Sequence, residues 1–356
     1  MKALIAMSGG VDSSVAALLM KEAGWDCIGC TMKLYNNDDL DLPAGQTCCS
    51  LDDVEDARSV CRRLQIPFYV FNYQADFRRY VIDRFVQCYE CGLTPNPCVD
   101  CNRFIKLNEL FLRAAELSCD CVVTGHYARV EETPDGYVLK KARCAAKDQT
   151  YVLYNLTQEQ LAHLRLPLGE LEDKDETRRL AETHSFRNHA KPDSQDICFV
   201  PDGDYAAAVE RFSGRKSEPG DFIDTDGRFI ARHKGIIHYT LGQRKGLGLS
   251  FAEPHFVTNI DPENRTVTLG LSQDLFRTDG DAADFHWISG RVPEGPVRCT
   301  AKIRYRHKEA PATVTPTGPD TVHVSFDEPQ RAFTPGQSLV LYDGEICLGG
   351  GILVRS

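Results

Sequence analysis

Hydrophobic residues follow a different pattern in each half of this 356-residue chain. In the first half, short apolar runs that predict buried strands alternate with amphipathic segments that predict helices. The expected strands are 2–7, 27–34, 67–71 and 121–124, and the expected helices are 13–24, 52–64, 76–89 and 106–115, the first capped by Ser13 and Ser14. Such alternation is typical of a doubly wound α/β domain, in which helices cover both faces of a parallel sheet.

The pattern changes after about residue 200, where short β-branched runs are separated by Gly, Pro and Asp. These runs are 256–257, 266–269, 297–303, 312–314 and 322–324. Short strands between turn residues are typical of small β-barrels. We therefore predict an α/β domain at 1–200, a central β-rich domain at 201–280 and a C-terminal β-barrel at 281–356.

Composition narrows the class of protein. The apolar run at the start of the chain ends at Ser8, which is too short for a signal peptide or a membrane span, so we expect a cytoplasmic protein without membrane contact. The chain has 15 cysteines, an odd number, and no secretion signal. Metal ligation or sulfur chemistry is therefore a better interpretation of these cysteines than a disulfide framework.

Positive charge is concentrated locally although the formal net charge is −10. The stretch 228–248 has five basic residues and no acidic one, and 285–310 has six basic residues against two acidic ones. Both stretches are suited to nucleic-acid phosphates, because local charge decides such contacts. The alternative is that they are solvated faces of ordinary domains.

The sequence SGGVDSS at residues 8–14 lies directly between the first expected strand and helix. Glycines let the backbone approach a phosphate, and the N-terminus of a helix attracts anions. Asp12 would repel phosphate unless a Mg²⁺ ion bridges the two. The loop resembles the SGGxDS loop of the ATP pyrophosphatase family, which cleaves ATP between the α and β phosphates and adenylates an oxygen. The alternative is an ordinary Gly-rich turn.

Further motifs along the chain specify the family. They are GHY at 125–127, TPNPCVDCN at 94–102, KDQTY at 147–151, DSQDICF at 193–199, HYTLGQRKGLG at 238–248, GQS at 336–338 and CLGGG at 347–351. In their order along the chain they resemble tRNA-specific 2-thiouridylases of the MnmA/TrmU type, and the resemblance covers essentially the whole chain. It implies ATP-dependent 2-thiolation of the wobble uridine of tRNA, in which the 2-carbonyl oxygen is adenylated and sulfur then displaces AMP.

The resemblance also implies roles for individual residues. Cys101 would be the nucleophile and Cys198 would carry a persulfide, supplied by an upstream donor such as a cysteine desulfurase or a sulfur relay protein. Release of the product would leave a Cys101–Cys198 disulfide. The residues implied around ATP are Ala6, Met7, Ser8, Gly9, Gly10, Val11, Asp12, Ser13, Met32 and Gly125. Those implied at the target base or tRNA are Asn96, Pro97, Cys98, His126, Lys147, Asp148, Gln149, Arg304, Tyr305 and Gln337.

Cys98 departs from the family pattern, because many members have Asp at this position. One alternative makes Cys98, Cys101 and Cys198 the ligands of a [4Fe-4S] cluster with an open iron that delivers sulfide. Another assigns zinc to the paired Cys-x-x-Cys motifs of Cys88, Cys91, Cys98 and Cys101. The competing functions are a different adenylating ligase or amidotransferase that uses the same loop, and a non-catalytic zinc-containing tRNA-binding protein.

Overall fold

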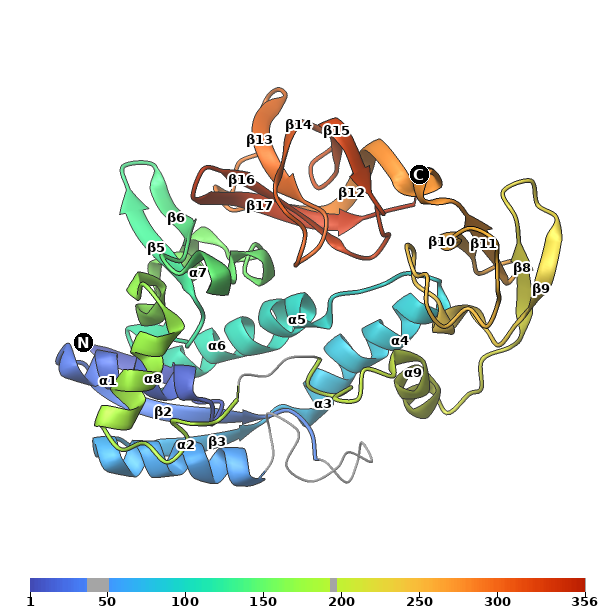
Figure 1. Ribbon diagram of the computed structural model, residues 1–356. Coiled ribbons are helices and arrows are strands. Elements are labelled where there is room, and N and C mark those ends of the chain that lie inside the picture. Colours follow the sequence, from blue (N-terminus) through green and yellow to red (C-terminus); the bar gives the residue numbers. More distant parts are fainter. Residues whose placement is uncertain (37–50, 193–196, 356) are drawn as a thin grey trace.

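The computed structural model describes residues 1–36, 51–192 and 197–355. Figure 1 shows the N-terminal α/β layer, the C-terminal barrel above it, and a smaller sheet beside both. In the described residues no helix is both long and apolar enough to cross a membrane. The predicted α/β fold followed by two mostly β domains is confirmed.

The N-terminal sheet is parallel throughout, with the strand order β3-β2-β1-β4-β7. Its strands are β1 (Lys2–Ala6), β2 (Asp26–Lys33), β3 (Phe68–Asn72), β4 (Cys121–Val123) and β7 (Leu164–Arg165). Alternate residues of β1 pack on opposite faces: Leu4 joins one hydrophobic core, and Ala3 and Ile5 join the other. This alternation is what a sheet buried on both faces requires.

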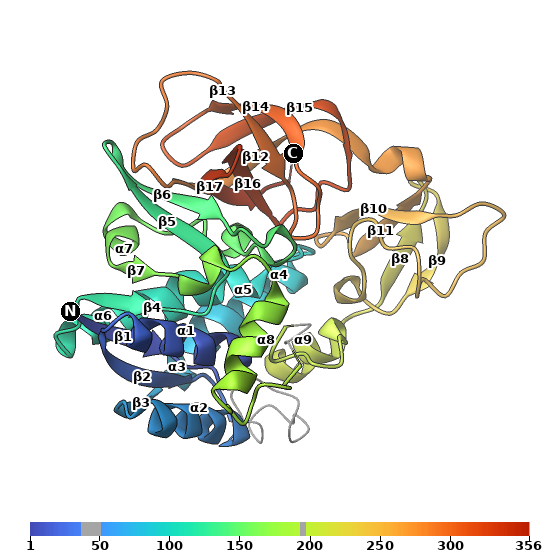
Figure 2. The same cartoon turned by 60° about the vertical axis from the view of Figure 1, so that its left-hand side comes forward.

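Helices cover both faces of this sheet (Figure 2). The helices on the Ile5 face are α1 (Val11–Glu22), α2 (Leu51–Leu64) and α8 (Lys174–Thr183). Those on the Leu4 face are α3 (Gln74–Phe77), α4 (Asp83–Glu90), α5 (Pro97–Asp100) and α6 (Asn108–Glu116), joined by π-helical segments η2 (Arg78–Ile82) and η3 (Cys101–Leu107). Each predicted helix of this domain is present.

The predicted serine cap of the first helix is wrong. The helix begins at Val11, and Gly10 occupies its N-cap position without a capping side chain. The hydroxyls of Ser13 and Ser14 instead donate to the carbonyl oxygen of Gly10, at 3.1 and 3.0 Å. A serine inside the first helical turn is free to bond back to the preceding carbonyl in this way.

The central domain contains a four-stranded sheet in the order β10-β11-β8-β9. Its strands are β8 (Gly220–Ile223), β9 (Phe229–His233), β10 (Phe256–Asp261) and β11 (Thr266–Gly270). It is preceded by α9 (Tyr205–Ser213), which the sequence pattern did not predict. The rings of Tyr205 and Tyr89 stack at 6.3 Å, which seats this helix on α4.

The C-terminal domain is a closed barrel, because β12 pairs with both β15 and β17. Its strands are β12 (Phe276–Trp287), β13 (Val297–Lys302), β14 (Ala310–Pro316), β15 (Val322–Arg331), β16 (Ser338–Asp343) and β17 (Ile346–Leu353). The hairpin of β5 (Ala128–Thr133) and β6 (Gly136–Lys141) comes from the α/β domain and pairs with β17. The two domains therefore share a continuous sheet.

The remaining elements are short. They are α7 (Gln158–Ala162) and the 3₁₀ turns η4 (Ala145–Lys147), η5 (Thr150–Val152), η6 (Pro167–Glu170), η7 (Ile236–His238) and η8 (Ser272–Leu275). The turns η4 and η5 form the KDQTY region between the β5–β6 hairpin and α7. These turns place the KDQTY motif next to the barrel.

Candidate active site

The SGGVDSS loop connects β1 to α1 at the carboxyl edge of the parallel sheet. Gly9 has φ 77°, and a Cβ there would lie 2.4 Å from the backbone oxygen of Asp53. Only glycine allows both this conformation and this approach. The loop is therefore pressed against α2 and directs the N-terminus of α1 toward the crevice, an arrangement suited to a phosphate group.

Gly125 follows β4, the neighbour of β1 at the point where the order of strands reverses. A Cβ on Gly125 would lie 2.8 Å from the amide nitrogen of Ser13 and 2.9 Å from the carbonyl carbon of Asp12. The two loops thus touch at the crevice where nucleotides bind in open α/β sheets. Met32, near the carboxyl end of β2, belongs to the same edge. The structure brings the expected ATP residues together.

Asp12 is held by two groups that the sequence motifs did not reveal. Its Oδ1 accepts a 2.9 Å hydrogen bond from the hydroxyl of Tyr127 and forms a salt bridge with Lys174. Tyr127 is buried, and its hydroxyl also contacts Thr177 of α8 at 2.8 Å. Lys174 is the first residue of α8. A lysine at this position places a cation beside the phosphate loop, although it lies far outside the Walker pattern.

A second set of residues supports the loop from behind. The amide of Asn188 donates to the backbone oxygen of Gly9 at 2.8 Å and to Ser14 Oγ at 2.9 Å. Lys191 forms salt bridges with Asp53 at 2.6 Å and Asp56 at 2.9 Å. Asp53 is almost fully buried, so this ion pair fixes the start of α2 against the loop.

The NPCVDCN motif forms a helix start on the opposite face of the sheet. The side chain of Asn96 caps the helix by accepting a 3.2 Å bond from the amide of Cys98, and Pro97 occupies the first turn. Cys98 is exposed and Cys101 is buried. Cys101 begins the π-helical segment η3, a type of distortion that is frequent at functional sites.

Cys198 packs on the same hydrophobic core as Cys101. Its carbonyl oxygen accepts a 3.0 Å hydrogen bond from the hydroxyl of Tyr35, and the following Phe199 packs edge-on against Phe77 and Phe85. The preceding part of this motif, residues 193–196, lies outside the described residues. The two cysteine-bearing segments therefore share one core although 97 positions separate Cys101 from Cys198 in the sequence.

The described residues do not assemble a metal site. Within 1–36, 51–192 and 197–355, no three side chains among His, Cys, Asp and Glu are grouped to hold a metal ion. The cysteines considered for an iron–sulfur cluster, and the four considered for zinc, all lie in these ranges. Burial, reinforced by Asp100, raises the pKa of Cys88 to about 11.

Comparison with known proteins agrees with this geometry. Family models match in three consecutive parts: a tRNA methyl transferase HUP domain at 1–202, a tRNA methyl transferase PRC-barrel domain at 209–271 and an aminomethyltransferase beta-barrel domain at 279–353. The tRNA-specific 2-thiouridylase MnmA of Clostridioides difficile is 51% identical over 100% of this chain and 98% of its own. That of Clostridium kluyveri is 48% identical over 99% of each. The chain belongs to the tRNA-specific 2-thiouridylase family.

A 4-thiouridine synthetase–RNA complex with bound ATP matches 60% of this chain and 54% of its own, at 17% identity and a TM-score of 0.33. The full-length relatives are what establish the family of this chain.

Several residues expected to face tRNA in a 2-thiouridylase gather between the barrel and the NPCVDCN helix. Tyr305 is 41% exposed, and its ring contacts Tyr151 at 5.7 Å. Burial raises the pKa of Tyr305, and the nearby Asp148 and Cys98 raise it further. These influences place Tyr305 beside the exposed cysteine, where an aromatic ring is suited to stack on an unpaired base.

His126 follows Gly125 in the loop after β4. Its Nδ1 is 2.8 Å from Thr124 Oγ1 at the end of β4. Burial and the charge of Lys106 lower the pKa of His126 to about 3, so the imidazole is neutral at physiological pH. Lys106 comes from η3, the segment that begins at Cys101. No sequence motif indicated Lys106 as a neighbour of this histidine.

Three other expected tRNA residues make internal contacts instead. Asp148 accepts from Ala142 N at 3.1 Å and Thr150 Oγ1 at 2.6 Å. Gln149 accepts from the amide of Tyr127 at 2.8 Å, and Arg304 donates to the carbonyl of Arg331 at 3.2 Å. Asp148 and Gln149 therefore shape the loop that presents Lys147.

Proposed function

We propose that this chain uses ATP to replace the 2-carbonyl oxygen of the wobble uridine of tRNA with sulfur. The supporting observation is that the groups needed for adenylation lie at one edge of the sheet, and that the cysteines needed for sulfur transfer lie on the core beneath that sheet. The phosphate loop with Asp12 and Lys174 lies at the crevice. Cys101 and Cys198 lie on segments that pack on the core beneath the same sheet. The family to which the chain belongs supports the same reaction.

The first step is adenylation. The backbone N–H groups at the start of α1 and the ammonium of Lys174 would hold the phosphates, while the uridine 2-oxygen attacks the α-phosphorus and pyrophosphate leaves. Asp12 is the residue of the loop that would bind a Mg²⁺ ion together with the phosphates, and such an ion neutralises charge on the leaving pyrophosphate. The Tyr127 hydroxyl orients the Asp12 carboxylate for this role.

The second step is sulfur transfer. The terminal sulfur of a Cys198 persulfide attacks C2 of the activated base, and AMP leaves with the former 2-oxygen. The Cys101 thiolate then attacks Sγ of Cys198, which breaks the S–S bond, releases the 2-thiocarbonyl and forms a Cys101–Cys198 disulfide. An external thiol reductant restores both thiols. We derive no step through an iron–sulfur cluster, because the described cysteines do not assemble one.

The proposal includes the partners of this cycle. They are tRNA with uridine at the wobble position and a persulfide or sulfide donor, such as a cysteine desulfurase or a sulfur relay protein. The charges of Cys98 and Lys147 act on Tyr305, and these residues together with His126 would receive the anticodon. We place the reaction in the cytoplasm, where unmodified tRNA is the substrate.

Nucleoside mass spectrometry tests the function directly. Anaerobically purified protein is incubated with unmodified tRNA, ATP, Mg²⁺ and either a persulfide donor or sulfide. We expect 2-thiouridine to accumulate and to depend on ATP, Cys101 and Cys198. Absence of 2-thiouridine with both sulfur sources would exclude the proposal, and adenylation of a small metabolite instead of tRNA would identify a different ligase of the same fold.

A further inference from the structure

The segment that leads into the NPCVDCN helix is bound by the barrel of the C-terminal domain. The amide of Thr94 donates to the carbonyl of Pro335 at 2.9 Å, and the side-chain amide of Gln337 donates to the carbonyl of Thr94 at 2.8 Å. Both backbone polar groups of Thr94 are therefore satisfied by one barrel loop, two residues before the Asn96 cap.

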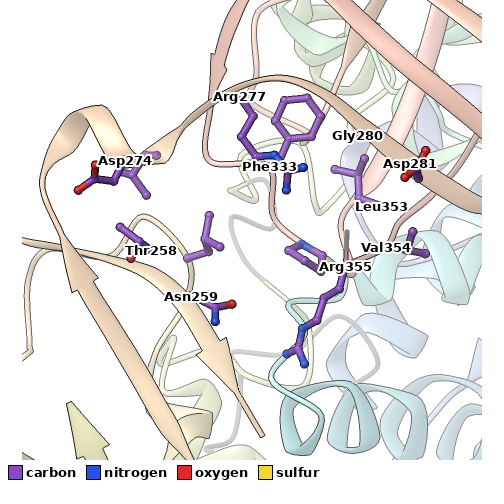
Figure 3. A pocket seen from close by; sticks show the side chains of 13 residues that line it. Thr258, Asn259, Asp274, Arg277, Gly280, Asp281, Phe333, Leu353, Val354 and Arg355 are labelled. Atoms are coloured by element: carbon purple, nitrogen blue, oxygen red, sulfur yellow. The ribbon is translucent and has the colours of Figure 1, made fainter. Parts of the chain in front are cut away.

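A second contact comes from the end of the last barrel strand. Arg355 donates to the carbonyl of Cys91 at 2.8 Å and to that of Gly92 at 3.1 Å. These carbonyls follow α4, where a helix leaves unpaired acceptors and its dipole attracts a cation. Arg355 lies at the edge of a cavity of about 130 Å³ between the barrel and the central domain. Figure 3 shows its side chain extending from the barrel toward the helical segment below.

Two glycines allow the barrel and the segment 91–103 to lie close together. Gly336 has φ 92°, and a Cβ there would lie 2.9 Å from the amide nitrogen of Thr94. Gly92 has φ 63°, and a Cβ there would lie 2.8 Å from Nη2 of Arg355. A side chain at Gly336 would meet the backbone of Thr94 and separate the two surfaces, whereas one at Gly92 would displace the end of Arg355 and meet Ile260 Cγ2 at 2.8 Å.

A third contact with the barrel comes after Cys98 and Cys101 in the sequence. Arg103, two residues after Cys101, makes a bidentate salt bridge with Asp284 of β12, with Nη2 to Oδ1 at 3.0 Å. Asp284 has φ 49°, in the left-handed region, which aspartate tolerates better than most residues other than glycine. The barrel therefore contacts the segment 91–103 both before Cys98, at residues 91–94, and after Cys101, at Arg103.

We propose that Gln337, Arg355 and Asp284 are positioning residues that fix the segment 91–103, and with it Cys101, against the nucleotide crevice. Gln337 then acts through Thr94, because one N–H of its side-chain amide donates to the carbonyl of that residue. The inference rests on the proposed thiolation for its effect on rate. Its effect on the accessibility of Cys101 does not depend on that reaction.

The test compares matched glutamine variants. Gln337→Glu keeps the shape of the side chain but cannot donate to Thr94. The control is Gln158→Glu, because Gln158 donates in the same way to Ile288 of the barrel at 2.8 Å but does not contact the segment 91–103. Arg355→Ala and Arg355→Lys form a second pair, in which lysine retains a donor for the carbonyls. Thermal unfolding of each variant checks that the fold persists.

Two readouts separate the possible outcomes. In thiolation assays we expect Gln337→Glu and Arg355→Ala to lower kcat about tenfold or more with less than about a twofold change in KM for tRNA, because displaced reacting groups lose rate rather than affinity. Arg355→Lys should recover most of the rate. Without tRNA, alkylation of the buried Cys101 by iodoacetamide should accelerate in the two disruptive variants but not in Gln158→Glu, while alkylation of the buried barrel residue Cys347 stays unchanged.

The proposal is overturned if Gln337→Glu raises KM for tRNA at unchanged kcat, since that result makes Gln337 a tRNA contact. It is also overturned if the alkylation of Cys101 is the same in all variants. If the wild-type protein forms no 2-thiouridine, the function has failed, but the alkylation rates still decide whether the barrel positions the segment.

Discussion

The hydroxyl of Tyr127 donates a 2.9 Å hydrogen bond to Oδ1 of Asp12, across 115 positions of sequence. Tyr127 follows the GH pair that ends the β4 loop, and Asp12 lies in the phosphate loop after β1. The bond therefore joins the two loops that form the crevice. The orientation of the Asp12 carboxylate therefore depends on Tyr127, which lies outside the phosphate loop.

Replacing Tyr127 with phenylalanine tests this link. The change removes the donor to Asp12 and the contact with Thr177 in a buried site, so we expect a loss of about 1–2 kcal/mol in the free energy of unfolding. KM for ATP should rise several-fold in pyrophosphate-release assays, because Asp12 loses its orientation. Tyr69→Phe is the control, since Tyr69 is 46% exposed on the edge strand β3. Equal effects in both variants would contradict the link.

Lys174 is expected to contribute to ATP binding through charge. Lys174→Met removes an ammonium that forms charge-assisted hydrogen bonds, each with a net value of about 1.5–3 kcal/mol. We therefore expect KM for ATP to rise about 10–100-fold while the affinity for tRNA stays the same. Lys216→Met provides the control, because Lys216 pairs with Glu210 on the exposed surface of the central domain. A matching loss of tRNA affinity would place Lys174 in the tRNA interface instead.

Gly125→Ala should impair the crevice by steric contact. The added methyl group would meet backbone atoms of Ser13 and Asp12 below 3 Å, and backbone does not yield as a flexible side chain does. We expect ATP binding, measured by calorimetry, to fall at least about tenfold. Gly295→Ala is the control, because a Cβ there meets nothing within 4 Å. Normal ATP binding by Gly125→Ala would show that the two loops are not in contact.

His126 predicts a pH dependence of stability. Its pKa is about 3 in the folded chain, below the ordinary value of 6.5, because burial and Lys106 disfavour the imidazolium. Between these values the unfolded chain binds a proton that the folded chain does not. The contribution of neutral His126 is therefore present above pH 6.5 and is lost as the pH falls, by about 1.4 kcal/mol per unit.

Urea unfolding at pH 6.5 and pH 5.0 measures this contribution. His126→Gln should lose less free energy of unfolding over this interval than the wild type, by about 2 kcal/mol. Lys106→Met should lose the same free energy as the wild type over this interval, because burial is the larger cause of the shift and keeps the pKa of His126 below both pH values. If His126→Gln and the wild type lose the same free energy, the histidine is not held neutral.

The alternation of strands and helices, and the order of the domains, could be predicted because apolar periodicity reports directly on buried faces. The phosphate loop was also predictable, because its glycines and its place between a strand and a helix are local properties of the sequence. Such signals located SGGVDSS between the first strand and helix, whereas Met32 and Gly125 were expected near ATP from the family resemblance. The local signals also placed both cysteine motifs in the α/β domain.

The contacts that complete the site were not predictable, because they join residues far apart without a pattern in either segment. Lys174 and Asn188 lie in a stretch with no motif, and their partners in the loop are 162 and 179 positions away. The β5–β6 hairpin joins the barrel through backbone hydrogen bonds, which any sequence can form. Gln337 belongs to a recognisable motif, but its inward direction depends on the docking of two domains.

A single-turnover experiment tests the central claim most directly. Protein carrying one persulfide on Cys198, freed of iron by chelation, is mixed with ATP, Mg²⁺ and unmodified tRNA without reductant, and both the tRNA and the protein are analysed by mass spectrometry. The account predicts one 2-thiouridine per persulfide together with a Cys101–Cys198 disulfide, and no product from Cys101→Ser or Cys198→Ser. Product that appears only when iron is restored, or that forms without the disulfide, would contradict it.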